Sequence, residues 1–355
     1  MTIKAVNIDD IESVRAADPG KMMEAVINFP SQCRQAVDMA ERWTPPVFNP
    51  QKIVIIGMGG SAIGGELLRA YAVNECKVPI LVSREYDIPA FVDETTLVLV
   101  SSYSGNTEET LTSYKRALVR GAKIAAFSSG GKLKELAVQD EVPFFEVPSG
   151  YQPRAALGFG FFPLLAALVK TGCISDKSQE IEETLTILEE CKNMWKPDVP
   201  SDMNFAKILA KKLHRKNPVI YGSWGYKGAA ALRWKCQLNE NSKVFSSWNV
   251  MPEMNHNETA GWDGHIEGYR DIHAVILRDR EDPVRIQKRV ELTKMILMQK
   301  TEVDEVWAWG KTPLAKMLSL CYFGDFASVY LAFIQGLDPT SVKVIEWLKE
   351  ELAKG

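Results

Sequence analysis

A cluster of hydroxyl-bearing residues lies near position 100 of the sequence. The segment Ser101-Ser-Tyr-Ser-Gly-Asn-Thr-Glu-Glu-Thr110 places Ser102, Ser104 and Thr107 at a tight turn just before a helical stretch. Side-chain hydroxyls, together with the free N–H groups of a helix N-terminus, suit a phosphomonoester. A helix whose hydroxyls only cap its own backbone is the structural alternative, and it explains one serine better than a cluster. The spacing therefore predicts a phosphate cradle.

A glycine-rich loop stands upstream of this cluster, in the segment Gly57-Met-Gly-Gly-Ser-Ala-Ile-Gly-Gly65. Gly59 and Gly60 let the backbone approach a ligand closely. Ser61 supplies a hydroxyl at the start of the following helix. We expect these three residues to complete the phosphate cradle.

The same loop also matches the dinucleotide pattern G-x-G-x-x-A through Gly57, Gly59 and Ala62. Such sites usually have an acidic residue at the end of the second strand, where a serine and an arginine stand here. Because Glu85 and Asp87 follow closely, a nicotinamide cofactor stays an open alternative. A Walker-type nucleotide loop is excluded, since no Gly-Lys-Ser/Thr follows the glycines.

The elements that must position these loops are short apolar runs separated by helical stretches. Strands that are apolar on both sides and alternate with helices indicate a parallel sheet covered on both faces. In the first half the runs are Ile53–Ile56, Ile80–Val82, Leu97–Val100, Ile124–Phe127 and Phe144–Val147. In the second half the pattern restarts, with strand candidates at Pro218–Tyr221, Val244–Phe245, His273–Leu277 and Val303–Trp309. Ligands of such sheets bind beyond the carboxyl ends of the strands.

Helical spacing fills the intervals between these strands. The predicted helices are a polar lead-in over 8–44, a buried helix over Ala155–Val169, a charged helix over Ser178–Lys192, a helix from Gly225 to about Gln237, and closing helices over 313–335 and 341–353. The expected fold class is therefore α/β, with two doubly wound parallel-sheet domains that form a duplicated sandwich and closing C-terminal helices. We place the domains at residues 1–175 and 195–355.

The overall composition excludes several classes of partner and cofactor. The chain has 355 residues, 46% of them hydrophobic, and a net charge of −3, which leaves no basic excess for nucleic acid. The N-terminus lacks the apolar core of a secretory signal, and no uninterrupted apolar run reaches the roughly 18 residues that span a bilayer. Six scattered cysteines indicate reduced thiols, and four histidines leave zinc few ligands. We expect a cytoplasmic protein without nucleic-acid or membrane partners, metal or organic cofactor.

Several further segments carry a resemblance to a known family. They are Pro153-Arg154-Ala-Ala156, Arg233-Trp-Lys-Cys-Gln-Leu-Asn-Glu-Asn-Ser-Lys243, Met251-Pro-Glu-Met-Asn-His-Asn-Glu258, and the closing Asp338-Pro339 with Ile345-Glu-Trp-Leu-Lys349. Together with the two loops, they make the chain resemble the bifunctional phosphoglucose/phosphomannose isomerases, which have sugar isomerase (SIS) domains. The resemblance runs from about residue 50 to 352. Many sugar-phosphate binders share the serine loop, whereas the Asn-Glu-Asn and Pro-Glu-x-x-His segments are more selective.

The resemblance implies an activity. It is the interconversion of glucose 6-phosphate, and of mannose 6-phosphate as well, with fructose 6-phosphate through a cis-enediol, as in glycolysis and gluconeogenesis. The substrate is a small sugar phosphate, and no cofactor is implied. The resemblance also implies a homodimer in which the ring-opening histidine is supplied by the neighbouring subunit.

Residue roles follow from the same resemblance. Glu240 matches the family's base, which moves a proton between C2 and C1, and its asparagine neighbours are placed to orient it. His256 matches the ring-opening group, because an imidazole can give and take protons near neutral pH. It lies in a predicted connection over about 247–271, which is long enough to suggest function. Lys349 matches a C-terminal lysine that assists ring opening, although other lysines crowd this end. Arg154 is expected near the substrate, where its charge stabilises the enediolate.

Two other classes of protein stay open. A sugar-phosphate-sensing module would keep the serine loop without needing the Asn-Glu-Asn or Pro-Glu-x-x-His segments. An NADP-dependent oxidoreductase would depend on Gly57, Gly59 and Ala62, and titration with a nicotinamide cofactor distinguishes it from an isomerase.

Overall fold

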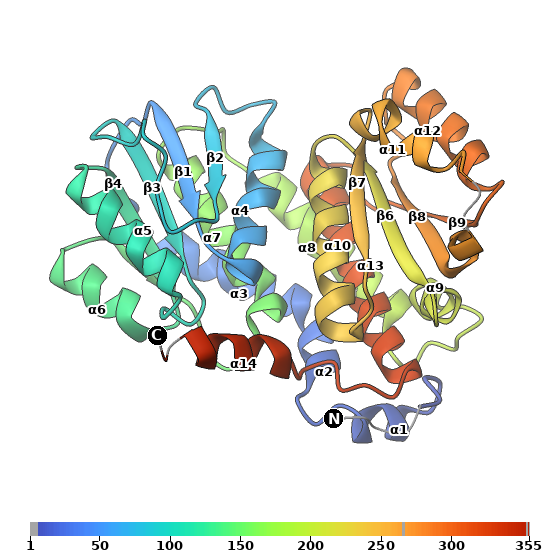
Figure 1. Ribbon diagram of the computed structural model, residues 1–355. Helices are drawn as coiled ribbons and strands as arrows, with labels where there is room; N and C mark the ends of the chain where they lie inside the picture. Colours follow the sequence, from blue (N-terminus) through green and yellow to red (C-terminus); the bar gives the residue numbers. More distant parts are fainter. Residues whose placement is uncertain (1–5, 265–266, 353, 355) are drawn as a thin grey trace. The chain divides into compact units, whose positions relative to one another are not determined.

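The computed structural model describes residues 6–264, 267–352 and 354, and its chain divides into two compact units (Figure 1). The first-sheet unit comprises Asn28–Leu188 and Gly310–Met317. The second-sheet unit comprises Met1–Ile27, Glu189–Trp309 and Leu318–Gly355. Each unit contains one parallel sheet, as the two runs of apolar segments predict.

The first-sheet unit is built on five parallel strands in the order β2-β1-β3-β4-β5. Their bounds are β1 Lys52–Ile56, β2 Ile80–Ser83, β3 Thr96–Ser101, β4 Lys123–Ser128 and β5 Phe144–Glu146. All five strands were predicted. The central strand β3 is buried along its whole length, which explains why its sequence is apolar on both faces.

Helices cover both faces of this sheet. Helix α4 (Gly59–Ala72) joins β1 to β2, whereas α5 (Glu108–Val119) joins β3 to β4 and α6 (Gly131–Gln139) joins β4 to β5. In Figure 1, α5 and α6 lie on one face and α4 on the other. Because the chain leaves β1 and β3 in opposite directions, a topological switch point lies between their carboxyl ends.

The remaining helices of this unit pack against α4 or against one another. They are α3 (Phe29–Arg42), the short 3-10 helix η1 (Pro153–Ala155) and α7 (Leu157–Lys170), while α8 (Ser178–Trp195) leads from this unit into the other. Helix α7 is the predicted apolar helix, and it is buried although it contains Pro163.

The second-sheet unit has four parallel strands in the order β7-β6-β8-β9. The strands are β6 Asn217–Ser223, β7 Ser247–Met251, β8 Ile272–Arg278 and β9 Glu302–Trp307. The helices of its central part are α9 Phe205–Leu213, α10 Tyr226–Ser242, η2 Glu253–His256, α11 Glu258–Gly261, η3 Glu267–Asp271 and α12 Val284–Leu297. The switch point of this sheet lies between β6 and β8.

The predicted strand at Val244–Phe245 is wrong. Helix α10 continues to Ser242, beyond the expected end, and Lys243 closes it in the left-handed conformation (φ 54°). Val244 N then donates to Leu238 O, so this residue belongs to the helix C-cap. The strand of this region is β7, whose mixed sequence Ser-Trp-Asn-Val-Met hides it from an apolar pattern. Within its described residues, the predicted long connection over 247–271 consequently contains a strand and three short helices.

The N-terminal segment belongs to the second-sheet unit, which differs from the predicted boundary at 1–175. Instead of one lead-in helix, the predicted lead-in forms α1 (Ile11–Ala16) and α2 (Met22–Ile27) in this unit, whereas α3 belongs to the first-sheet unit. The backbone before α1 bonds to the second-sheet unit, because Val6 N donates to Phe333 O. Asp9 also forms a 2.9 Å ion pair with Lys207, which is fully buried.

Two helices close the chain, as predicted: α13 (Pro313–Ile334) and α14 (Lys343–Leu352). Among the described residues, α13 alone is long and apolar enough to cross a membrane by length and composition. However, 94% of its most apolar window is buried inside the protein, as in the core helix of a globular domain.

Candidate active site

The loops after β1 and β3 are joined by Ser61. This residue is buried on the first turn of α4, and its Oγ accepts a 2.9 Å hydrogen bond from Tyr103 N in the serine loop. Within that loop, Ser102 Oγ donates to Thr107 Oγ1 at 3.0 Å. The structure thus brings three of the predicted cradle hydroxyls together at the switch point of the first sheet.

The two helices that begin at this switch point, α4 and α5, have no side-chain N-cap. Met58 precedes α4 and Thr107 precedes α5, and neither side chain makes a cap hydrogen bond. The N–H groups in the first turn of a helix have no partner within the helix, so uncapped they can bind an anion. The alternative in which the loop hydroxyls only cap their own helix therefore does not hold for Thr107. Ser104 is exposed on the same loop and accepts a 3.3 Å bond from Asn106 N.

Gly60 lets the segment that carries Arg154 approach the start of α4 closely. A Cβ atom at Gly60 would lie 2.8 Å from Pro153 C and 2.9 Å from Arg154 N, so only glycine permits this contact between α4 and η1. Arg154 itself is buried, with 3% of its surface exposed. The neighbouring Gly59 adopts a positive φ of 50°. Gly59, Gly60 and Arg154 therefore belong to one structural group with the cradle loops.

Tyr103 is a contributor that the sequence reasoning missed. Its phenol donates to Pro148 O at 3.0 Å and accepts from Tyr151 N at 2.8 Å. Its backbone N–H donates to Ser61. Tyr103 thus joins the serine loop both to α4 and to the segment that leads into η1. Its place inside the Ser-Ser-Tyr-Ser-Gly motif was the available signal.

The corresponding edge of the second sheet is filled by its own side chains. Lys227, at the start of α10, forms a 2.8 Å ion pair with Asp282, and both side chains are buried. The adjacent Tyr226 donates a 2.5 Å hydrogen bond to Asp279. An internal carboxylate therefore lies where the first sheet presents hydroxyls and free N–H groups. This favours the first-sheet unit as the place for phosphate.

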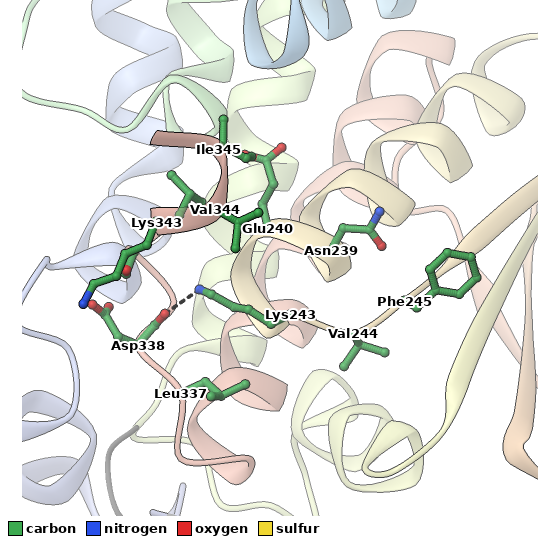
Figure 2. Close-up of a pocket in the computed structure, with 12 residues that line it drawn as sticks. Asn239, Glu240, Lys243, Val244, Phe245, Leu337, Asp338, Lys343, Val344 and Ile345 are labelled. Atoms are coloured by element: carbon green, nitrogen blue, oxygen red, sulfur yellow. Dashed lines mark hydrogen bonds between the residues drawn. The ribbon is translucent and has the colours of Figure 1, made fainter. Parts of the chain in front are cut away.

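Glu240 lies half-buried near the end of α10, at a cavity of about 530 Å³ (Figure 2). The cavity is also lined by the first turn of α14, including Lys343, Val344 and Ile345. In Figure 2 the Glu240 side chain extends toward this turn. Lys243 Nζ donates to Asp338 O at 2.5 Å, which links the end of α10 to the segment before α14.

The two asparagines beside Glu240 anchor the end of its helix. Asn239 Oδ1 accepts a 3.0 Å bond from Ser246 N, and Asn241 Nδ2 donates a 2.9 Å bond to Ser328 Oγ. The sequence suggested that they orient the Glu240 carboxylate. These contacts favour an indirect form of that hypothesis, in which the asparagines fix the helix that carries it.

His256 and Lys349 lie on two other segments of the second-sheet unit, and both are exposed. His256 ends the short helix η2, and Lys349 lies on α14. Lys343 lines the Glu240 cavity, whereas Lys349 follows it by about two helical turns. The second-sheet unit thus holds Glu240, His256 and Lys349.

Metal and thiol chemistry have few candidates. Across the residues that the structure describes, no group of three or more His, Cys, Asp or Glu side chains is placed to hold a metal ion. All six cysteines are free. Burial raises the pKa of the Cys321 thiol to about 12, which keeps it protonated and unreactive at neutral pH.

Comparison with known proteins assigns the family. Residues 202–352 match the bacterial phospho-glucose isomerase C-terminal SIS domain. A bifunctional phosphoglucose/phosphomannose isomerase of Caldicellulosiruptor bescii is 46% identical over 338 residues, which are 94% of this chain and 99% of that protein. The enzyme of the same name from Aquifex aeolicus is 37% identical over 89% of this chain and 94% of its own.

Solved structures confirm the fold. The crystal structure of a hypothetical protein from Thermus thermophilus superposes with a TM-score of 0.73 at 16% identity, covering 97% of this chain and 93% of that one. Two parallel-sheet units, the cradle loops and close similarity along nearly the whole chain agree with one another. The chain belongs to the bifunctional phosphoglucose/phosphomannose isomerase family.

Proposed function

We propose that this chain is an aldose–ketose isomerase that interconverts glucose 6-phosphate, and mannose 6-phosphate as well, with fructose 6-phosphate. The observation that carries the proposal is the cradle of the first sheet, where hydroxyls and two uncapped helix starts converge at the switch point. Such a site suits the terminal phosphate of a sugar. Gly59, Gly60, Ser61, Ser102, Ser104 and Thr107 are the proposed phosphate-binding residues.

Glu240 is the proposed base. In the open-chain aldose its carboxylate takes the C2 proton, and the electron pair of that bond forms the C1–C2 double bond of the enediolate. The hydroxyl proton on the C2 oxygen passes to the C1 oxygen, and Glu240 returns its proton to C1. The C2 oxygen thereby becomes the carbonyl, which completes the ketose without an external oxidant or reductant. Arg154 stabilises the negative oxygen of the enediolate. Half-burial of Glu240 in a cavity supports the role, because a base works best shielded from bulk water.

The enediol accounts for both substrates. Glucose 6-phosphate and mannose 6-phosphate differ only at C2, and that stereocentre is lost when the enediol forms. One base therefore serves both sugars if each is held with its C2 hydrogen toward the carboxylate.

His256 and Lys349 are proposed to open the sugar ring. Ring opening moves a proton from the C1 hydroxyl to the ring oxygen, which needs a group able to exchange protons near neutral pH. His256 is exposed on η2 and is free to meet a substrate. Lys343 lines the Glu240 cavity, so it competes with Lys349 for the assisting role.

The assembled enzyme is proposed to be a cytoplasmic homodimer in which His256 serves the active site of the neighbouring subunit. The exposure of His256 supports this arrangement, because a side chain that faces solvent in one chain can enter a second chain's site. No metal or organic cofactor takes part in the proposed reaction.

A coupled assay tests the function. Formation of fructose 6-phosphate is measured from glucose 6-phosphate and from mannose 6-phosphate, each with and without EDTA after exhaustive dialysis. Turnover of both sugars that is insensitive to EDTA is the expected result. If a nicotinamide cofactor is consumed without coupling enzymes, the chain is an oxidoreductase. If the sugars bind without turnover, it is a sensing module.

A further inference from the structure

The segment that carries His256 is packed into the core of the second-sheet unit. Met254, two residues before the histidine, is fully buried, and Trp262 is 5% exposed. Both side chains join the core cluster that contains Tyr221 of β6. Trp262 also stacks on Tyr269 with ring centroids 5.4 Å apart. An exposed histidine is thus carried by a backbone whose flanks are fixed.

Glu258 anchors the backbone on the C-terminal side of His256. Its Oε1 accepts a 2.5 Å hydrogen bond from the Tyr221 phenol, and its Oε2 accepts a 2.6 Å bond from Asn249 Nδ2. Tyr221 lies on β6 and Asn249 on β7, so one carboxylate is fixed by two neighbouring strands. Burial, followed by the negative charge of Glu258, raises the pKa of Tyr221, which keeps its hydroxyl available as a donor.

Asn255 anchors the backbone on the N-terminal side of His256. Its Nδ2 donates to Thr293 Oγ1 at 2.9 Å, and its Oδ1 accepts from Arg289 at 3.2 Å. Both partners lie on α12. His256 therefore stands between a residue anchored on a helix and a carboxylate anchored on the sheet, with one residue between it and Glu258.

We propose that Glu258 is a positioning residue for His256. The bonds from Tyr221 and Asn249 fix Glu258, and Glu258 in turn fixes the backbone that carries the imidazole. This inference depends on the proposed ring-opening role of His256. A short 3-10 helix makes few hydrogen bonds of its own, so its direction is set by what it packs against. Both oxygens of Glu258 are directed at the sheet, which suits a clamp rather than contact with substrate.

Glu258→Ala removes both bonds of the clamp. We expect kcat on glucose 6-phosphate to fall by about 10- to 100-fold, because a misplacement of about 1 Å can cost on the order of 100-fold. KM should change little, since the phosphate is held elsewhere. In a His256→Ala background, Glu258→Ala should cause no further loss of kcat, because residues that act as a unit are not additive. Glu267→Ala is the matched control, a carboxylate of the same connection that is exposed on η3.

Tyr221→Phe is the milder variant, which keeps the buried ring and removes one of the two bonds. It should lower kcat in the same direction by a smaller factor, and it serves as the test if Glu258→Ala does not fold. Wild-type kcat in both variants would overturn the inference. The inference would also be overturned if Glu258→Ala lowered kcat as much in the His256→Ala background as it does in the wild-type background. Glu258 would then act independently of the histidine. Full activity of His256→Ala itself would overturn the ring-opening assignment and this inference together.

Discussion

Asn241, the residue after Glu240, donates a 2.9 Å hydrogen bond to Ser328 on α13. One turn earlier on the same face of α10, Gln237 donates to Asp325 Oδ1 at 2.8 Å. Residues four apart in a helix lie one above the other, so these contacts set the rotation of α10 about its axis. The direction in which Glu240 leaves the helix is fixed by the same contacts.

A buried ion pair continues this row of contacts. Arg233 lies one turn before Gln237, and its guanidinium bonds to Asp325 Oδ2 at 2.7 Å. Burial raises the pKa of Asp325, and the bonds from Arg233 and Gln237 offset part of that effect. Removing one partner of such a pair leaves a buried charge alone, which is strongly destabilising. The row is therefore a structural support for the end of α10.

Glu240→Gln should abolish isomerisation and leave binding of the sugar phosphate nearly intact. The amide keeps the shape of the side chain and loses the base, whose contribution is on the order of a hundred- to ten-thousand-fold in rate. Steady-state kinetics and titration with a phosphorylated sugar acid measure the two effects. Glu267→Gln is the control. A variant that retains more than about a tenth of wild-type kcat would contradict the assignment of Glu240 as the base.

Ser102→Ala and Thr107→Ala should each weaken substrate binding. A hydrogen bond to a charged group is worth about 1.5–3 kcal/mol, so KM should rise roughly 10- to 100-fold. Thr186→Ala on α8 is the control, because its hydroxyl bonds to the preceding helical turn at Glu182 O. Unphosphorylated glucose should not compete with glucose 6-phosphate. Equal competition by the two sugars would show that the cradle does not bind phosphate.

Gly60→Ala should impair the enzyme even though the change adds one methyl group. The new Cβ would lie within 3 Å of the backbone at Pro153 and Arg154, so the contact between α4 and η1 must open. Activity and thermal stability should both fall. Gly160→Ala is the matched control, since a Cβ there meets nothing within 4 Å and alanine is the better helix former. Equal behaviour of the two variants would argue against a close α4–η1 contact.

Mixing Glu240→Gln and His256→Ala subunits should restore activity. Each homodimer is expected to be nearly inactive, whereas a mixed dimer has one site that keeps both groups. With random pairing half of the dimers are mixed and each has one good site of two, so recovery should approach about a quarter of wild type. Mass tagging verifies the exchange of subunits. Complete exchange without recovery would mean that His256 serves its own chain or takes no part in the reaction.

Glu75 should contribute to stability at neutral pH and not in strong acid. Partial burial opposes its ionisation, but bonds from Lys177 and Ser175 outweigh this effect and lower the pKa of Glu75 from 4.5 to about 2. The contribution of Glu75 to stability is therefore fully present above its ordinary pKa of 4.5. It is lost as the pH falls toward the pKa in the folded protein, about 2. Urea unfolding of Glu75→Gln should show a lower midpoint than wild type at pH 7, and the difference should shrink between pH 5 and pH 2. Glu94→Gln, an exposed carboxylate of the same unit, should show no such trend.

The sequence by itself determined the parallel strands and the loops that follow them. β1 and β3 are continuous apolar runs because both faces of the sheet are covered, and the polar loops begin where that burial ends. The family was also recognisable, because motif residues such as those around Glu240 and His256 are contiguous in the chain. The roles of these residues remain predictions.

Only the tertiary structure decided the contacts between segments that are distant in the sequence. The bond between Ser61 and Tyr103 and the approach of Gly60 to Arg154 each join two such segments. Strand β7 was missed because an edge strand with mixed residues has no apolar pattern of its own. Glu258 gave no local signal either, since its role depends on where β6 and β7 place their side chains. Local patterns report whether a residue is buried, whereas the partner that it meets is set by the packing of the whole unit.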